Sequence, residues 1–411
     1  MGSFDTLQSL LSLPIRDLPV EPRAVGGRRG LFATVDIPPS TPLLTIPARA
    51  LLNIRTLAPH YPPGLNAIQL ISLHLCLYRP VGSTQPSLDP LYGPYLSTLP
   101  IEFDFHPLTD RVRHTNALLP PSIARALESL HSRYLQDWHT IQEYLQINSR
   151  QLSMKPHVRL DRSHDALEED FLWGWLNVNT RCIYHRLKST RSHPDNLTLC
   201  PILDFANHTV AGPCMTLRLS DAERSNTAPI PRLGDPLTLL SPDTPTKPGE
   251  ELYLTYGAHP NRTLFVEYGF VVAGTSDHSR AEVEVQDLVE PLFDTDDGAV
   301  KKKMLQDCGY WGDWTLDGSP AVSYRLITAL RLLHAPLIDS DGALGRWQDT
   351  LTGLRDTISE ANEAAWKETV VGVCATLVQR ANTRRSNVSG DISILWEEEL
   401  QVASRVSNML N

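Results

Sequence analysis

The chain has 411 residues, a formal net charge of −10 and a hydrophobic content of 41%. This length predicts about two or three domains, and the composition is that of an ordinary soluble globular protein. The acidic balance argues against general nucleic-acid binding, because that requires a basic surface that displaces counterions from phosphates. A basic protein is the partner that this charge favours.

Six cysteines are spread along the chain without a C-x-x-C pair: Cys76, Cys182, Cys200, Cys214, Cys308 and Cys374. This spacing predicts neither a zinc site nor a disulfide framework, so we expect no metal and reduced thiols in the cytosol or nucleus. No apolar run approaches the roughly 18 residues of a membrane span, and no basic segment leads into a signal-peptide core. We therefore expect an intracellular protein that does not span a membrane.

Two short β-prone runs lie near the start, at residues 31–33 and 43–46. The Pro38-Pro39-Ser40 stretch between them predicts a hairpin that joins two strands. Just before the first run, Arg28 and Arg29 stand beside glycines, where guanidinium groups and backbone amides could hold a carboxylate or a phosphate. A solvated loop would explain the same residues.

The sequence becomes helical between about residues 60 and 165. Apolar residues recur at helical spacing in two series: Ile68, Ile71 and Leu75, then Ile123, Leu127, Leu130, Tyr134, Trp138, Ile141 and Leu145. A further helix is predicted to begin near Ser163 or Asp165 and to lead toward Arg181. An arginine at the inner end of an apolar helix is costly to bury alone, so Arg181 is either on the surface or paired with an anion.

Three polar residues, Asp204, Asn207 and His208, fall within the apolar segment 199–217. Such residues should be buried there, and buried polar groups need hydrogen-bond partners. A satisfied core histidine and a ligand-binding group are both consistent with this pattern.

Residues 249–270, GEELYLTYGAHPNRTLFVEYGF, place Tyr256 and Tyr268 each before a glycine. A glycine after an aromatic residue permits a sharp turn or a close backbone approach to a ligand. Taken alone, the stretch could equally be a strand, a turn and a helical segment of an ordinary core. Beyond it, a strand is predicted at 281–285, and apolar residues at helical spacing from about residue 320 predict a separate α-helical domain.

Five segments resemble, in the same order, the SET-domain methyltransferases, in particular the class related to the plant Rubisco large-subunit lysine methyltransferase. They are GRRGLFATVDIPP from residue 27, PYLSTLP at 94–100, DFLWGWLNVNTRCIY at 170–184, PILDFANH at 201–208 and the stretch 249–270. Each motif alone is a weak signal, and it is their shared order that carries the resemblance.

The resemblance implies an α+β fold. A β-rich SET domain with a pseudoknot would occupy residues 23–275, split by a helical insert at about 60–165. Residues 1–22 would form an N-terminal segment, and residues 276–411 an all-α substrate-binding domain. In such folds the Asn-His segment is threaded through a loop, which is an exception to the general rule against threaded connections.

The implied activity is methyl transfer from S-adenosylmethionine to the side-chain amine of a lysine in a protein substrate. Tyr256 falls on the catalytic tyrosine of the family. The implied cofactor-binding residues are Arg28, Arg29, Gly30, Leu31, Arg181, Asn207, His208, Tyr256 and Phe270. The implied substrate-binding residues are Arg181, Asp204 and Tyr268, of which Tyr268 would line the lysine channel.

The chain departs from the family pattern in two places. Thr180 stands where the family usually has serine, and Arg28-Arg29 replaces a smaller, often acidic, stretch. We expect a monomer in the cytoplasm, the nucleus or both, whose substrate is a ribosomal protein, a translation factor or another non-histone protein.

Other functions compete with lysine methylation. The same class includes an actin histidine methyltransferase, but that branch departs from Tyr-Gly-Phe at the last motif, whereas this chain keeps it at residues 268–270. A catalytically silent SET-fold binding module is a second alternative, against which the intact Tyr256 and Asn207-His208 argue. A hydrolase is a distant third, because the chain has no G-x-S-x-G nucleophile elbow.

Overall fold

The computed structural model describes residues 18–25, 28–82, 85–109, 116–225, 228–273, 281–317, 322–338 and 342–411. Its contacts divide the chain into two compact units: unit 1 is residues 1–104 with 131–258, and unit 2 is residues 105–130 with 259–411. Part of the predicted helical insert, and the last part of the predicted SET segment, therefore group with the C-terminal helices. The boundaries 23–275 and 276–411 follow the sequence pattern and stay a prediction.

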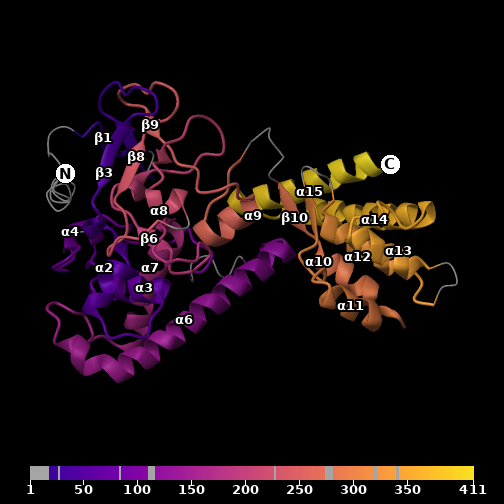
Figure 1. Ribbon diagram of the computed structural model, residues 1–411, viewed down its shortest axis with the longest axis horizontal. Helices are drawn as coiled ribbons and strands as arrows, with labels where there is room; N and C mark the ends of the chain where they lie inside the picture. Colours follow the sequence, from indigo (N-terminus) through magenta and orange to yellow (C-terminus); the bar gives the residue numbers. More distant parts are fainter. Residues whose placement is uncertain are drawn as a thin grey trace. The chain divides into compact units, whose positions relative to one another are not determined.

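The described part of unit 1 contains three small antiparallel sheets (Figure 1). They join β1 (Val20–Val25), β2 (Arg28–Ala33) and β9 (Glu251–Leu252); β3 (Pro42–Ile46), β8 (Leu237–Leu240) and β7 (Thr216–Leu217); and β4 (Leu52–Asn53), β6 (Leu197–Leu199) and β5 (Ile183–Tyr184). Leu31 of β2 lies opposite Leu252 of β9, and both are almost fully buried. This pairing brings the start of the chain next to the stretch that carries Tyr256.

The predicted hairpin between residues 31–33 and 43–46 is wrong, although both runs are strands. Strand β2 has β1 on one side and β9 on the other, whereas β3 pairs with β8, so the two runs lie in different sheets. The connection between them pairs instead with a distant part of the chain, through a bridge from Ile37 to Thr246. A pair of prolines signals a turn, but it does not select the strand that fills the neighbouring position.

Helices α3 (Ala67–Leu77) and α7 (His164–Arg181) pack against each other in unit 1. The Asn66 side chain caps α3 by accepting a hydrogen bond from the Gln69 N–H, and the Gln69 side-chain oxygen accepts one from the Asn66 N–H. The Ser163 side chain caps α7 by accepting from the Ala166 N–H. The predicted start of this helix is therefore confirmed.

The long helix α6 (Pro121–Ser153) confirms the second predicted apolar series, because the seven residues of that series, from Ile123 to Leu145, are all buried. Its later turns belong to unit 1, where Trp138 stacks on Phe171 of α7 with ring centroids 5.2 Å apart. The shorter helical elements of this unit are η1 (Ala48–Ala50), α2 (Ile54–Leu57), η2 (Ala58–His60), α4 (Gly93–Leu96), η4 (Leu203–Phe205) and α8 (Asp221–Arg224).

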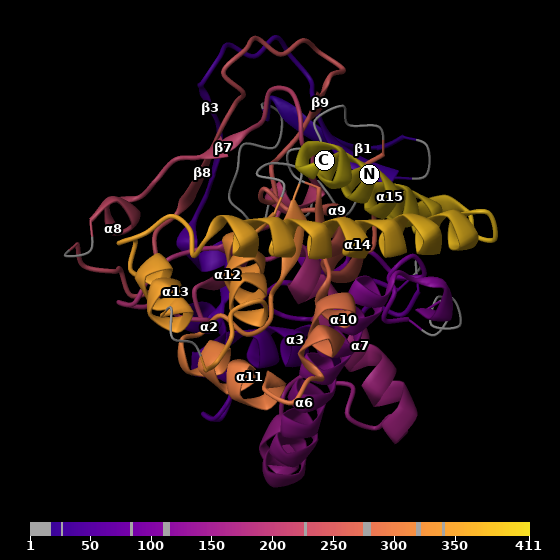
Figure 2. The same ribbon diagram turned by 90° about the vertical axis from the view of Figure 1, so that its right-hand side faces the viewer.

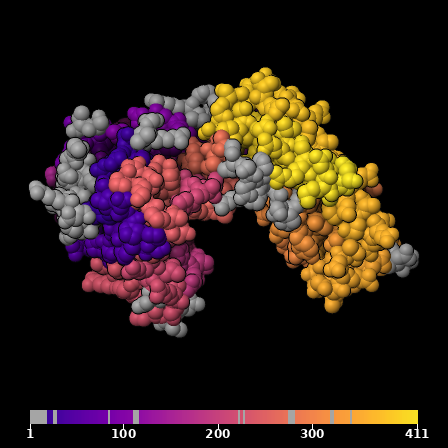
Figure 3. All heavy atoms as spheres, turned by 90° about the horizontal axis from the view of Figure 1, so that it is seen from above, coloured from indigo at the N-terminus to yellow at the C-terminus, as the bar shows by residue number. Residues whose placement is uncertain are grey.

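Unit 2 is mainly helical. Its elements are η3 (Asn116–Leu118), α9 (Asn261–Thr263), the π-helix η5 (Leu264–Tyr268), α10 (Gln286–Val289), η7 (Glu290–Phe293), α11 (Gly298–Asp307), α12 (Tyr324–Leu333), α13 (Ala343–Leu351), α14 (Glu360–Arg385) and α15 (Gly390–Leu410). Helices α14 and α15 pack along each other (Figure 2). Their atoms carry the last colours of the scale, toward yellow, in Figure 3. The predicted strand near 281–285 is confirmed as β10 (Glu282–Glu284), which pairs with a second short strand, β11 (Thr315–Asp317). Within the described ranges, no helix is long and apolar enough to cross a membrane.

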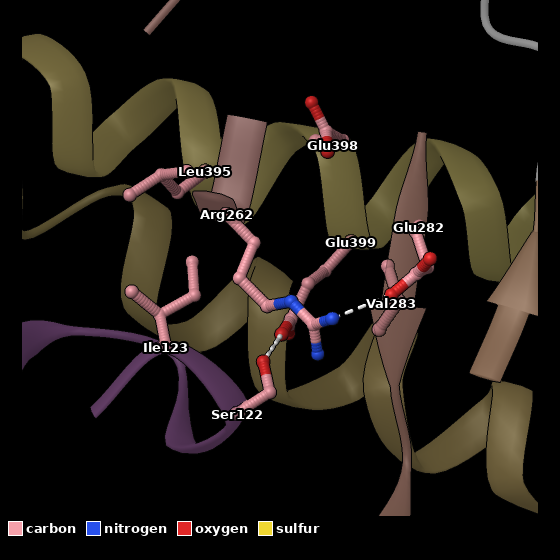
Figure 4. A pocket seen from close by; sticks show the side chains of 8 residues that line it. All are labelled: Ser122, Ile123, Arg262, Glu282, Val283, Leu395, Glu398 and Glu399. Atoms are coloured by element: carbon pink, nitrogen blue, oxygen red, sulfur yellow. Dashed lines mark hydrogen bonds and ion pairs between the residues drawn. The ribbon is translucent and has the colours of Figure 1, made fainter. Parts of the chain in front are cut away.

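A buried carboxylate connects α15 to the start of α6 in unit 2. Only 4% of Glu399 is exposed, and its Oε1 accepts a hydrogen bond from Ser122 Oγ at 3.4 Å. Figure 4 shows these two side chains pointing toward each other. The Glu399 Oε2 atom is buried and has no hydrogen-bond partner among the described residues.

Burial raises the pKa of Glu399 to about 8, although the charge of Arg380 opposes this rise. The carboxyl group is therefore neutral at neutral pH.

Replacing Glu399 by glutamine should remove a pH-dependent loss of stability. As the pH rises from 4.5 to about 8, the folded state keeps a proton on Glu399 that the unfolded chain releases, so wild-type stability falls through that window. Glutamine cannot ionise, and its amide oxygen can still accept from Ser122. We expect the free energy of unfolding of Glu399→Gln, relative to the wild type, to rise by a few kcal/mol between about pH 5 and about pH 8 in urea unfolding.

Glu397→Gln is the control for this measurement, because 41% of the Glu397 side chain is exposed and it pairs with Arg385 at the surface. The difference between this control and the wild type should stay nearly constant over the same pH range. A constant difference for Glu399→Gln as well would show that the folded protein does not hold a proton on Glu399.

Candidate functional site

Arg181 forms an ion pair with the buried Asp204 in unit 1. Arg181 is the last residue of α7, and its Nη1 donates to the Asp204 carbonyl oxygen at 2.8 Å and to the carboxylate Oδ2 at 3.4 Å. Only 1% of the Asp204 side chain is exposed. Burial raises the pKa of Asp204, and the charges of Arg181 and Arg29 oppose that rise. The sequence left two alternatives for Arg181, a surface position or a pairing with an anion. The structure shows the pairing, with Asp204 as the anion.

Arg29 joins this cluster from strand β2. Its guanidinium carbon lies 4.3 Å from the ring centroid of Phe205, which is a cation–π contact. Burial lowers the pKa of Arg29 and Asp204 opposes this, and the guanidinium group stays charged in either case. The fully buried Tyr95, from the motif at 94–100, places its hydroxyl near Asp204. The side chain of Arg28, the preceding residue in β2, lies outside the described residues.

Asp204 lies in the 3-10 turn η4, and the backbone directly before this turn is strained. Ile202, directly before the 3-10 turn η4, has φ 72° and ψ −48°. This is close to the γ-turn geometry that is rare and strained, and such backbone strain costs about 1–3 kcal/mol. The Ile202 side chain is fully buried, which holds the turn in place. Nothing in the local sequence signals this conformation, because a β-branched residue disfavours a positive φ.

Asn207 is held by Glu251, a residue that sequence analysis missed. Asn207 Nδ2 donates to Glu251 Oε1 at 2.6 Å and to the Arg29 carbonyl oxygen at 3.1 Å. The second carboxylate oxygen accepts from the Tyr253 hydroxyl at 2.7 Å. A Cβ at Gly30 would overlap the Glu251 carboxylate, so this close approach requires glycine. The alternation of side chains along a strand could have shown that Glu251 and Tyr253 share a face.

His208 and Tyr256 lie against each other. The Tyr256 backbone N–H donates to His208 Nδ1 at 3.1 Å, and the two ring centroids are 5.1 Å apart. The Tyr256 hydroxyl donates to the Ala206 carbonyl oxygen at 2.9 Å. Backbone hydrogen bonds between residues 207–209 and residue 254 hold the two segments side by side in a parallel bridge. The Asn-His motif and the catalytic candidate, far apart in the chain, are thus brought together.

The two remaining aromatic residues of the prediction, Tyr268 and Phe270, belong to unit 2. Tyr268 ends the π-helix η5, and Gly269 follows with φ 80°. The Tyr268 ring centroid lies 6.2 Å from that of Phe270 and 6.1 Å from that of His259. Burial raises the pKa of the Tyr268 phenol, so this side chain is uncharged at neutral pH.

A cavity of about 310 Å³ lies beside Arg29 in unit 1. Its walls include Arg79, whose guanidinium carbon lies 5.4 Å from the ring centroid of Trp173 and whose Nη1 pairs with Asp170 at 2.9 Å. Of the predicted site residues whose side chains are described, Arg29 alone lines it. The cavity therefore adjoins the cluster through this arginine.

Unit 1 brings most of the predicted residues together: Arg29, Gly30, Arg181, Asp204, Asn207, His208 and Tyr256. Leu31 is fully buried in its sheet, so its side chain serves the core. Across the described residues, no three His, Cys, Asp or Glu side chains cluster as metal ligands would. The arrangement places the positive charges of Arg181 and Arg29 around the buried Asp204 carboxylate.

No protein-family model matches the chain. It is 28% identical to ribosomal lysine N-methyltransferase set11 of Schizosaccharomyces pombe over 305 residues, which cover 74% of this chain and 67% of that protein. It is 26% identical to SET domain-containing protein 4 of Homo sapiens over 403 residues, which cover 92% and 84%. A weaker match, 24% identical, covers 62% of this chain and 40% of the actin-histidine N-methyltransferase of Homo sapiens.

Among solved structures, the SET domain of LSMT bound to lysine and AdoHcy is similar over 100% of this chain and 91% of that chain, with a TM-score of 0.68. The two sequences are 19% identical. The likeness shows that the two chains share a fold.

Glu251→Ala should destabilise unit 1, because it leaves Asn207 Nδ2 and the Tyr253 hydroxyl without their shared acceptor. A hydrogen bond to a charged group contributes about 1.5–3 kcal/mol, and we expect the free energy of unfolding in urea to fall by about 2 kcal/mol. Glu250→Ala is the control, since Glu250 is exposed and accepts a local hydrogen bond from the Lys247 N–H. Equal losses in the two variants would contradict the role given to Glu251.

Proposed function

We propose that this chain, a SET-domain protein methyltransferase of the class related to the plant Rubisco large-subunit lysine methyltransferase, methylates lysine in a ribosomal or translation protein. The curated relatives and the solved structure that it resembles cover most of its length. They confirm the α+β SET fold, and they support the lysine methyltransferase class and S-adenosylmethionine as the methyl donor. The substrate class is the proposed part.

The acceptor amine must be neutral in order to attack a methyl group. Free lysine has a pKa of about 10.4, so presenting it deprotonated near pH 7.4 costs roughly 4 kcal/mol. A narrow apolar channel lowers that pKa, because burial disfavours the charged ammonium. Tyrosines suit the walls of such a channel, since their rings are apolar and their hydroxyls orient an amine without adding charge.

The observation that carries the proposal is the way in which Tyr256 is held. Its hydroxyl donates to the Ala206 carbonyl oxygen, its backbone N–H donates to His208, and its ring lies against the His208 ring. These contacts give the phenol oxygen a fixed position, and its lone pairs can accept a hydrogen bond from an amine. A silent binding module would have no need of a phenol fixed in this way.

The residues of unit 1 also fit the cofactor. S-adenosylmethionine supplies a methyl group on a sulfonium centre, and it carries a carboxylate. Arg181 Nε is buried and has no hydrogen-bond partner among the described residues. With the Arg29 guanidinium in the same cluster, it can donate to such a carboxylate. His208 lies against Tyr256, and Asn207 directly precedes it in the chain. The family resemblance implies a cofactor role for both residues.

Charge supports a ribosomal or translation protein as the substrate. The chain carries a net charge of −10, and an acidic surface speeds the encounter with a basic partner. Its similarity to a ribosomal lysine N-methyltransferase points in the same direction. We also propose that the protein is a monomer and that it is located in the cytoplasm or the nucleus. Its six cysteines are free thiols.

Histidine is the second acceptor to consider, because the chain also resembles the actin-histidine N-methyltransferase. The Tyr268-Gly269-Phe270 sequence favours lysine, because the histidine branch departs from it. Tandem mass spectrometry distinguishes the two products directly, since it locates each added methyl group on one residue of the substrate.

Tyr256→Phe should lower kcat by about 100-fold or more, because it removes the hydroxyl that orients the amine. The assay incubates ribosomal proteins from cells that lack this enzyme with labelled S-adenosylmethionine. Tyr324→Phe is a matched control, because its hydroxyl also donates to a backbone carbonyl, that of Thr350, at 2.7 Å. This control variant should keep nearly wild-type activity.

Full activity of Tyr256→Phe would overturn its catalytic assignment. Methyl groups found on histidine alone would overturn the choice of lysine. Calorimetry that detects no binding of S-adenosylmethionine at millimolar concentration would favour the silent binding module.

A further inference from the structure

A buried histidine lies against the turn that carries Tyr268 in unit 2. His106 has no exposed surface. Its Nε2 lies 3.3 Å from the carbonyl oxygen of Glu267, the residue directly before Tyr268. Its Nδ1 lies 3.2 Å from the backbone nitrogen of Leu108. Both ring nitrogens therefore have a partner within the same unit.

These two partners fix the tautomer of the His106 ring. A carbonyl oxygen only accepts, so Nε2 must carry the proton that is donated to Glu267. A backbone N–H only donates, so Nδ1 must be the unprotonated nitrogen that accepts from Leu108. Burial lowers the pKa of His106 to about 4. The ring is therefore a neutral donor of fixed orientation at physiological pH.

The Glu267 carbonyl needs such a donor because it lies at the end of a helix. The last carbonyl groups of a helix have no partner within it, and the π-helix η5 stops where Gly269 turns with φ 80°. π-helical turns are rare and often occur at functional sites. Since a peptide group is planar, holding this carbonyl also fixes the amide nitrogen of Tyr268.

The backbone on the other side of Tyr268 is fixed by packing. A Cβ at Gly269 would lie 2.9 Å from Phe105 Cδ2 and 3.1 Å from His106 Cα, so only glycine fits. Thr109 closes the same segment, because its N–H and its Oγ1 donate to the His106 carbonyl oxygen at 3.0 and 2.8 Å. Residues 105–109 thus form a rigid support for the backbone on both sides of Tyr268.

We propose that His106 is a positioning residue for Tyr268. Through the Glu267 carbonyl it fixes the peptide plane from which the Tyr268 side chain projects, and so it fixes the position of the ring that the proposed function expects beside the acceptor amine. The effect on catalysis rests on the proposed function, whereas the positioning of Tyr268 does not. Each methyl group enlarges the amine, so a fixed Tyr268 ring also limits how many methyl groups are added.

Two substitutions separate the two hydrogen bonds of the ring. His106→Gln keeps an N–H donor at about the reach of Nε2, so it should retain the bond to Glu267. His106→Asn keeps an acceptor at about the reach of Nδ1, so it should retain the bond from Leu108 and lose the bond to Glu267. Both variants replace a buried ring by a smaller side chain, so both lose packing contacts. Thermal unfolding measures the loss of stability in each variant.

The pKa of the Tyr268 phenol tests the contact between His106 and Glu267, and this measurement does not require enzymatic activity. In protein with carbon-labelled tyrosine rings, the Tyr268 resonance is assigned by its absence in Tyr268→Phe, and its titration gives the phenol pKa. Burial raises that pKa in the wild type. His106→Asn should bring it down toward about 10, whereas His106→Gln should leave it raised.

Nitrogen-labelled histidine in the wild type tests the proposal without a variant. The His106 resonances should show a protonated Nε2 and a bare Nδ1. A proton on Nδ1 instead would overturn the proposal, even where His106→Asn does not fold.

In the methyl-transfer assay, His106→Asn should lower kcat on the order of 10-fold and increase the share of more highly methylated product. The KM for S-adenosylmethionine should hardly change. His106→Gln should stay within about 3-fold of the wild type in kcat. This split between kcat and KM, with rescue by glutamine, would not arise from a merely structural role.

The proposal is overturned by equal effects of the two variants, or by an unchanged Tyr268 pKa in His106→Asn. A wild-type enzyme that transfers no methyl group, while the Tyr268 resonance moves only in His106→Asn, would overturn the proposed function instead. In that case the positioning of Tyr268 by His106 would still stand.

Discussion

The pairing of the buried Asp204 carboxylate is the interaction on which the candidate site of unit 1 depends. A carboxylate with so little exposure is costly unless opposite charges surround it. Arg181 supplies such a charge from the end of α7, and Arg29 supplies another from β2. Helix, strand and the 3-10 turn around Asp204 are therefore held in one arrangement, and the strained backbone of Ile202 is maintained by it.

The polar residues that follow Asp204 in the chain are each held by a partner that is distant in sequence. Asn207 follows Asp204 closely in sequence, and Glu251 of β9 holds its side chain. His208 comes next, and it accepts from the backbone of Tyr256. The catalytic candidate is thus fixed through its backbone, its ring and its hydroxyl.

In unit 2, burial keeps three titratable side chains neutral, those of His106, Tyr268 and Glu399. His106 stays unprotonated on Nδ1, Tyr268 keeps its phenolic proton and Glu399 keeps a carboxyl proton. In each case desolvation penalises the charged form and is the largest cause of the shift. Neutral hydrogen bonds orient the His106 ring and the Glu399 carboxyl group without the free-energy cost of burying an ion.

The sequence by itself determined the helices, the order of the motifs and most of the residues that gather around Tyr256. The helices were predictable because their apolar spacing and caps, such as Ser163 at the start of α7, are local signals. The strand pairing was not, since β2 and β3 lie in different sheets despite the turn between them. Only the tertiary structure decided that Glu251 holds Asn207 and that His106 donates to Glu267. These partners are 44 and 161 residues apart, and a contact over such separations is set by long-range packing, which no local periodicity encodes.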